Sequence, residues 1–173
     1  MKKLLALTIL ILIFSGLWAG GMYATGASLT LDSASNTSQV GLFLDNDNLV
    51  VTKDKETWIN PLLTNHFDLV FSGLFKDDGL EQIAFSYIGG AGAAFKPTSS
   101  LYINLSLGPS VFTTFGSHDG TFGVGIGGVV SFAYVFSDPG FMLKGGFETS
   151  YTLLFDSSNP MMVSGFVGLG FKI

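Results

Sequence analysis

The sequence contains neither cysteine nor arginine among its 173 residues. Without cysteine, the chain has no disulfide framework, no zinc–thiolate site and no thiol for a lipid anchor. Without arginine, it lacks the side chain that clamps phosphate groups bidentately and supplies much of the positive charge of nucleic-acid-binding surfaces. These two absences argue against a nucleic-acid-binding protein, and we expect no nucleic-acid partner.

Charged residues are scarce, at 12 % of the sequence, whereas hydrophobic residues make up 47 %. Soluble domains usually carry about 25 % charged residues, so we expect much of the surface to face something other than water. After the N-terminal segment, the sequence has no apolar run of the roughly 20 residues that a membrane helix needs. A chain in lipid without spanning helices has one other way to satisfy its backbone hydrogen bonds, which is a closed β-barrel.

The N-terminal segment has the pattern of a secretory signal peptide. Lys2 and Lys3 precede a short apolar run, residues 4–14, and small residues follow it. We expect residues 1–21 to be removed as a signal peptide and residues 22–173 to form the folded domain. An uncleaved anchor helix is the alternative.

Residues 121–136 show the pattern that the rest of the chain repeats. The stretch reads TFGVGIGGVVSFAYVF, with large apolar residues mostly at even positions and small residues mostly at odd positions. A period of two is typical of a strand. Strands of membrane barrels turn apolar side chains to lipid and small or polar ones to the lumen, and they carry aromatic residues near both interfaces.

Similar alternation occurs in seven other segments, which are residues 23–32, 39–45, 66–76, 83–96, 101–115, 141–155 and 161–173. The sequence therefore predicts an all-β fold, an eight-stranded antiparallel up-and-down transmembrane β-barrel. Residues 46–64 are the least regular part and could hold a short extra strand at 49–52, so a ten-stranded barrel is the runner-up.

Threading the strands up and down places two groups of aromatic residues at opposite rims, as interfacial belts require. One group is Phe95, Tyr134, Phe136, Phe141 and Phe171. The other is Phe75, Phe85, Phe115, Phe122, Tyr151 and Phe155.

The C-terminal residues, 168–173, read GLGFKI and are similar to the assembly signal of bacterial outer-membrane barrels, with Ile173 in place of the usual terminal aromatic residue. With this end and its strand pattern, the chain resembles the small outer-membrane β-barrels of the OmpA/OmpX-like superfamily. The resemblance implies an outer-membrane location in a Gram-negative-type envelope, a lipid bilayer around the barrel, and recognition by the barrel-assembly machinery through the C-terminal strand. We expect a monomer without cofactor or metal.

Strand parity places the charged residues Lys144, Glu148 and Asp68 inside the barrel. A buried charge needs a partner, so we expect a lumen polar network in which Lys144 pairs with Glu148 along one strand and Asp68 joins them. The favoured interpretation is a structural ion pair, and a gate or a proton path is the alternative.

Two function classes remain after these arguments. The first is a non-enzymatic outer-membrane barrel with a structural or surface-interaction role; the alternative is outer-membrane transport or binding of a small apolar molecule. Many inward glycines could leave a cavity, although four bulky residues also face inward: Ile88, Phe112, Met142 and Phe166. A lipid-modifying enzyme is disfavoured, because the adjacent residues Ser117, His118 and Asp119 cannot form a catalytic triad by adjacency alone.

Overall fold

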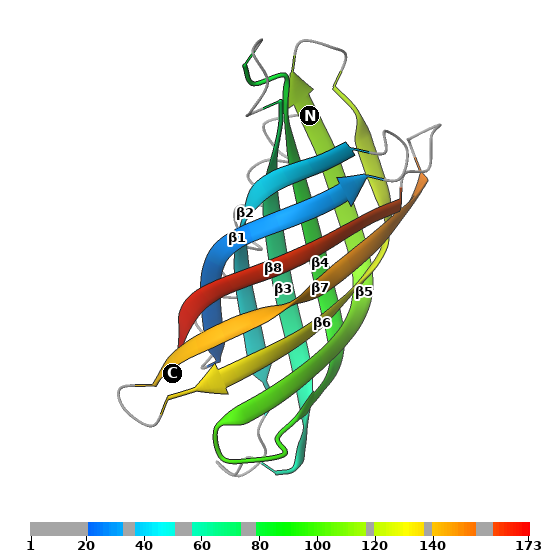
Figure 1. Cartoon of the computed structure of the whole chain (residues 1–173). Helices are drawn as coiled ribbons and strands as arrows, with labels where there is room; N and C mark the ends of the chain where they lie inside the picture. The colour runs from blue at the N-terminus through cyan, green and yellow to red at the C-terminus, as the bar shows by residue number, and fades with distance from the viewer. Residues whose placement is uncertain are drawn as a thin grey trace.

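In the computed structural model, eight antiparallel strands form one closed barrel (Figure 1). The structure describes residues 21–32, 37–50, 57–73, 79–116, 120–136, 140–154 and 161–173. The strands are β1 (Met22–Asp32), β2 (Thr37–Leu49), β3 (Ile59–Ser72), β4 (Gln82–Phe95), β5 (Leu101–Gly116), β6 (Phe122–Val135), β7 (Phe141–Leu154) and β8 (Met161–Lys172). Each strand pairs with its neighbours in sequence, and β8 closes the barrel on β1, which confirms the eight-stranded prediction.

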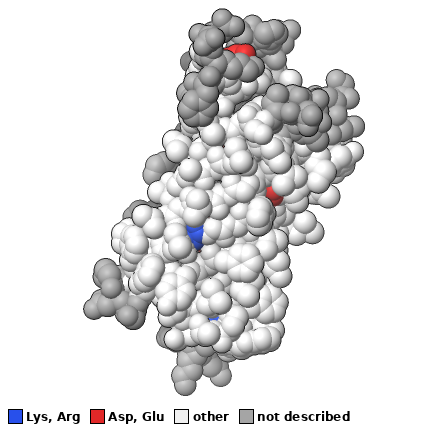
Figure 2. Space-filling model, in the orientation of Figure 1, with Lys and Arg blue, Asp and Glu red and all other residues white. Residues whose placement is uncertain are grey.

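The outer face of the barrel is apolar along the strands. Leucine, valine and phenylalanine side chains alternate outward, and the most exposed along the strands include Leu107 at 67 % and Phe147 at 64 %. Figure 2 shows that the described surface on this side is almost free of charged side chains. A surface of this kind is unfavourable in water and matches the hydrocarbon of a bilayer. The described residues include no helix long and apolar enough to cross a membrane.

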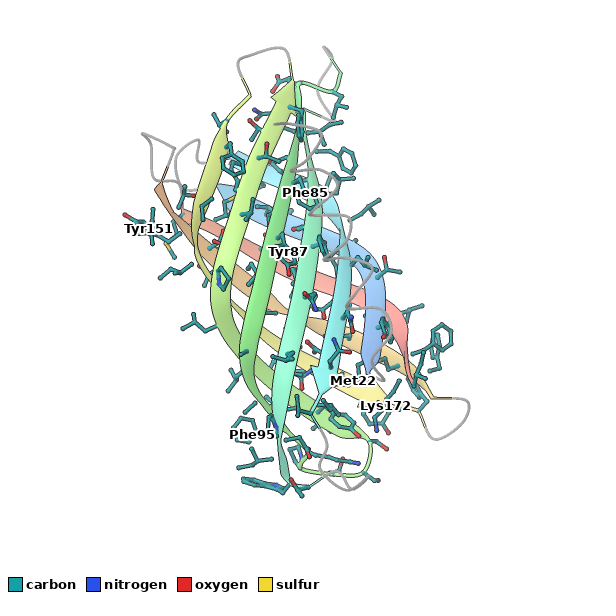
Figure 3. All side chains as sticks on the ribbon, turned by 180° about the vertical axis from the view of Figure 1, so that it is seen from behind. Met22, Phe85, Tyr87, Phe95, Tyr151 and Lys172 are labelled. Atoms are coloured by element: carbon teal, nitrogen blue, oxygen red, sulfur yellow. The ribbon has the colours of Figure 1, made fainter. Side chains whose placement is uncertain are left out.

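Aromatic rings gather near both ends of the barrel, as the threading of the sequence predicts. At the end that holds both termini of the barrel, Tyr134, Phe136, Phe141 and Phe171 contact one another in series, with ring centroids 5.2–5.9 Å apart. Figure 3 shows Phe95 near the same end and Phe85 and Tyr151 toward the opposite end. Phe75 and Phe155 lie outside the described residues.

The segment 46–64 is more regular than the sequence indicates. We predicted that one strand ends at Asp45 and the next begins at His66, but β2 continues to Leu49 and β3 begins at Ile59. Asparagine and aspartate have low strand propensity; in this segment Asp47 accepts hydrogen bonds from Thr64 and Asn104 inside the barrel, which favour its place in the strand. Eight strands close the barrel, so the ten-stranded alternative is wrong.

Large side chains fill the lumen where glycines make room for them. A Cβ atom added to Gly127 would lie 2.8 Å from Ile88 Cδ1, and one added to Gly146 would lie 3.0 Å from the ring of Phe166. These glycines therefore accommodate neighbouring bulk and do not leave a void at those points. Ile88, Met142 and Phe166 are buried, and Phe112 is half-buried.

Two glycines with left-handed backbone geometry allow a matched test of the turns. Gly140 has φ +80° and Gly79 has φ +79°. An added Cβ at Gly140 would lie 2.8 Å from the carbonyl oxygen of Lys172, whereas at Gly79 it would meet no atom of the described residues within 4 Å. We expect Gly79→Ala to lower the free energy of unfolding by about 1–2 kcal/mol through backbone strain alone, and Gly140→Ala to lower it further. Urea titrations of the refolded variants measure both losses, and equal losses would show that the contact with Lys172 is unimportant.

Candidate functional site

Six titratable side chains meet inside the barrel, and we call them the lumen polar cluster. They are Asp45 and Asp47 on β2, His66 and Asp68 on β3, and Lys144 and Glu148 on β7. Every one of them is at most 4 % exposed. The alternation of each strand places them there, because residues two or four apart on a strand share one face.

Lys144 joins one wall of the barrel to the other. Its Nζ atom lies 2.8 Å from Asp45 Oδ1 and 2.5 Å from Asp47 Oδ2. Asp47 also accepts hydrogen bonds from the hydroxyl of Thr64, at 2.6 Å, and from the amide of Asn104. Charge-assisted bonds of this kind are among the stronger polar interactions in proteins. The lysine therefore connects β7 to β2 across the lumen, and Asp47 extends the connection to β3 and β5.

His66 continues the cluster between two carboxylates. Its Nδ1 atom lies 2.8 Å from Asp45 Oδ2, and its Nε2 atom lies 3.2 Å from Glu148 Oε2. The imidazole ring also stacks on Phe43 at 5.8 Å and packs against Phe166 at 4.7 Å between ring centroids. The two phenylalanine rings also pack against each other, with centroids 4.8 Å apart, so the histidine connects the charged residues to the apolar filling of the barrel.

Asp68 forms a separate branch of the cluster that relies on hydroxyl groups. Ser28 Oγ donates a hydrogen bond to Asp68 Oδ1 at 2.6 Å, and Thr30 Oγ1 makes a longer contact with Oδ2 at 3.4 Å. Thr30 also hydrogen-bonds Ser164 at 2.8 Å. The Asp68 branch thus links β3 to β1 and β8, the two strands whose pairing closes the barrel.

The structure places Lys144, Glu148 and Asp68 in the lumen but pairs them differently from our expectation. Lys144 does not pair with Glu148; it reaches Asp45 and Asp47 on another strand. Residues four apart on a strand are separated by about 13 Å along the chain, so a lysine finds partners across the lumen more readily than along its own strand. Glu148 faces His66 instead.

Sequence reasoning missed three members of the cluster, Asp45, Asp47 and His66. The signal that could have found them is strand parity, because Thr64 and His66 share the face of Asp68, and Asp45 and Asp47 share the face of Phe43. Asp45 and His66 were the end residues of the predicted strands 39–45 and 66–76, and Asp47 lay outside both, so the alternation was not followed through this stretch.

The cluster has no arrangement suited to a metal ion. Within the described part of the chain, no group of three or more histidine, aspartate or glutamate side chains is placed to hold one. The Ser117, His118 and Asp119 group considered as a triad lies outside the described residues. What the cluster can do chemically is bridge strands and occupy the lumen with paired charges.

Comparisons with known proteins agree with this architecture. No protein-family model matches the chain, and no curated protein sequence matches it. Among solved structures, the chain is similar to Ail, the attachment invasion locus protein of Yersinia pestis, with TM-score 0.63 and 12 % identity over 90 % of this chain and 99 % of that one.

A second similar structure is that of Neisserial surface protein A (NspA), with TM-score 0.58 and 17 % identity over 90 % of this chain and 98 % of that one. The backbone structure of the Yersinia pestis outer membrane protein Ail in a phospholipid bilayer nanodisc is also similar, with TM-score 0.51 and 13 % identity over 88 % and 99 % of the two chains. At the level of the fold, these likenesses confirm the resemblance to the small outer-membrane β-barrels.

Proposed function

We propose that this protein is a non-enzymatic outer-membrane barrel with a structural or surface-interaction role. The observation that carries the proposal is the bridge from Lys144 to Asp45 and Asp47 across the lumen. A barrel of eight strands is narrow enough for side chains to fill its interior. Here ion pairs and large apolar residues occupy that interior together, which suits a stable scaffold better than an open pore.

The outer surface and the fold support the location. Outward-facing strand residues are predominantly apolar, and aromatic rings lie near both ends of the barrel. One similar structure belongs to a protein described as an attachment invasion locus protein, and another to a surface protein. These descriptions favour a role at the cell surface for the present chain.

One similar structure contains Ail in complex with the heparin analogue sucrose octasulfate. The present chain has no arginine and a formal net charge of −5, which disfavours a polysulfated ligand. Polysulfated ligands are anionic and favour surfaces rich in positive charge.

The C-terminal strand supports the expected assembly route. We propose that β8 is recognised by the barrel-assembly machinery, that residues 1–21 are removed beforehand, and that the barrel functions as a monomer. In the folded barrel β8 pairs with both β7 and β1. The hydrogen-bonding edges of β8 are therefore both used within one chain, and closure needs no second copy.

Planar-bilayer recording tests the proposed function. We expect the purified barrel to show no steady, porin-like conductance, because Lys144 is paired with two carboxylates and no ring of like charges lines the interior formed by the described residues. Phe166→Ala serves as a probe of the filling, since it removes a ring packed against Phe43 and His66. A reproducible large conductance step from the unaltered monomer would contradict the proposal.

A second candidate function is the binding of a small apolar molecule from the membrane. A hollow on the lipid-facing side of β3, β4 and β5 favours it, because the hollow contains polar side chains where a membrane barrel normally carries only apolar ones.

A further inference from the structure

A hollow of about 400 Å³ lies on the outer face of the barrel where β3, β4 and β5 run side by side. Leu63, Ala91, Leu107 and Pro109 form apolar parts of its wall. Its volume falls within the range of small-ligand sites, about 300–1,000 Å³. Such sites usually combine apolar walls with a few well-placed polar groups.

The polar groups in the hollow are Asn65 and Tyr87, and both are outward-facing. The Tyr87 hydroxyl donates a hydrogen bond to Asn65 Oδ1 at 2.8 Å. Within the described residues, the side chain of Asn65 has no other hydrogen-bond partner, so the two N–H groups of its amide remain available as donors. The bond from Tyr87 holds the amide in one orientation.

Asn65 lies near the middle of the lipid-facing band. Its register partner on β4 is Gly89, which is four residues from Phe85 and six residues from Phe95. Figure 3 shows Tyr87 at about half the height of the barrel, between these two phenylalanines. Polar side chains facing lipid at this depth are costly and commonly mark functional positions.

The floor of the hollow is a gap in the pairing of β4 with β5. The ladder passes from the pair Ile88–Ser110 to the pair Ala91–Leu107 and skips the two positions between them. Pro109 has no N–H group to donate to a neighbouring strand. Gly108 approaches β4 so closely that an added Cβ would lie 2.1 Å from the carbonyl oxygen of Gly89. Residues without bulk therefore form the hollow and leave backbone exposed within it.

We propose that this hollow binds a neutral fatty acyl compound and that the Asn65 amide donates a hydrogen bond to its carbonyl oxygen. The inference rests on the second candidate function and is independent of the closed lumen. The walls suit a hydrocarbon chain, whereas the amide requires an acceptor. Ordinary membrane lipids present only hydrocarbon at mid-depth, so they do not satisfy that donor. A fatty acid or a fatty acyl ester brings its carbonyl group to the amide.

The experiment uses the refolded full barrel in nanodiscs of ether-linked phosphatidylcholine, a lipid without acyl carbonyl groups. Methyl palmitate and palmitic acid, each labelled with ¹³C at the carbonyl, are titrated in separate arms. We expect saturable binding of one of them and a change in its carbonyl chemical shift. Asn65→Leu should weaken binding about fivefold, the factor that one hydrogen bond of about 1 kcal/mol provides, and should abolish the shift change.

Three further variants make the test specific. Tyr87→Phe removes only the hydroxyl that orients Asn65, so we expect weaker binding and an altered carbonyl shift. Ala91→Phe fills the hollow and should block binding while Asn65 is retained. Thr149→Leu is the matched control, because Thr149 is exposed on the outer face but lines a different hollow. Each variant is first checked for heat-modifiable migration on a gel, and if Asn65→Leu does not fold, Tyr87→Phe and Ala91→Phe decide the question.

Several outcomes would overturn the proposal. Equal binding by the unaltered protein and Asn65→Leu would show that the amide plays no part. Equal competition by hexadecane, which has no carbonyl group, would show recognition of hydrocarbon alone. Chemical cross-linking that finds a dimer lost in Asn65→Leu without any ligand would show that a second copy of the chain occupies this face. The bilayer recordings are unaffected by these results, so a failure here is distinguishable from a failure of the proposed structural role.

Discussion

Replacing Lys144 with methionine is expected to lower the free energy of unfolding by about 3–5 kcal/mol, the usual cost of leaving buried charges without their partner. Lys144 is fully buried. Among the described lysines, it is the one whose Nζ atom forms ion pairs with both Asp45 and Asp47. Methionine keeps much of the length of the side chain, so the loss would come from the missing charge and not from a large cavity. Urea titration of the variant refolded into lipid vesicles measures the effect.

The control for this prediction neutralises the carboxylates as well. In the triple variant Lys144→Met, Asp45→Asn and Asp47→Asn, no unpaired charge remains at the bridge, and we expect recovery of most of the lost stability. If Lys144→Met were as stable as the unaltered barrel, the ion pairs would not hold the lumen together. If the triple variant were no better than the single one, the loss would come from packing.

Replacing Phe147 with lysine is expected to lower the free energy of unfolding by about 2–4 kcal/mol, the cost of a lysine on the lipid face near the midplane. Phe147 is 64 % exposed on the outer face of β7 and lies between Phe141 and Tyr151, one near each end of the barrel. The loss arises because the ammonium group must either enter the hydrocarbon or be hydrated by water that penetrates the bilayer.

A matched substitution near one rim tests whether depth determines that cost. Phe171 also faces outward and packs edge-on against Phe141 in the aromatic belt. Phe171→Lys should cost about 0–1 kcal/mol for the charge, plus the lost contact between the rings. The same refolding titration compares the two variants. A larger loss for Phe171→Lys than for Phe147→Lys would mean that the lipid-facing band is placed incorrectly.

The sequence was enough to predict which side chains of each strand point to lipid and which point to the lumen. The alternation with a period of two shows this without knowledge of which strands pair. Phe132 and Tyr134 are exposed and Ser131 and Ala133 are buried, as their parity indicates. The two aromatic groups were also predictable, since they follow from the lengths of the strands and the direction of threading. The predicted number of strands depended on a single stretch, residues 46–64, where polar residues obscured the alternation.

The connections across the lumen were not predictable in the same way. Lys144 bonds to residues 97 and 99 positions away in the chain, and only the closure of the barrel and the tilt of its strands decide which walls face each other. Asp45 ended the predicted strand 39–45, and Asp47 fell in the expected connection after it, because aspartate is rare in strands. Asn65 was hidden for a similar reason, as it lay before the expected start of its strand.

Amine acylation read by mass spectrometry shows whether Lys144 is sealed inside a filled barrel. The folded protein and a boiled sample are treated with a water-soluble amine-reactive ester. Lys96 and Lys172, half-buried beside Tyr102 at one end of the barrel, serve as internal references. We expect Lys144 to stay unmodified in the folded protein while both references react, and all three lysines to react after boiling. Modification of Lys144 in the folded protein at the rate of Lys96 would show that water reaches the middle of the lumen and that the barrel is not filled.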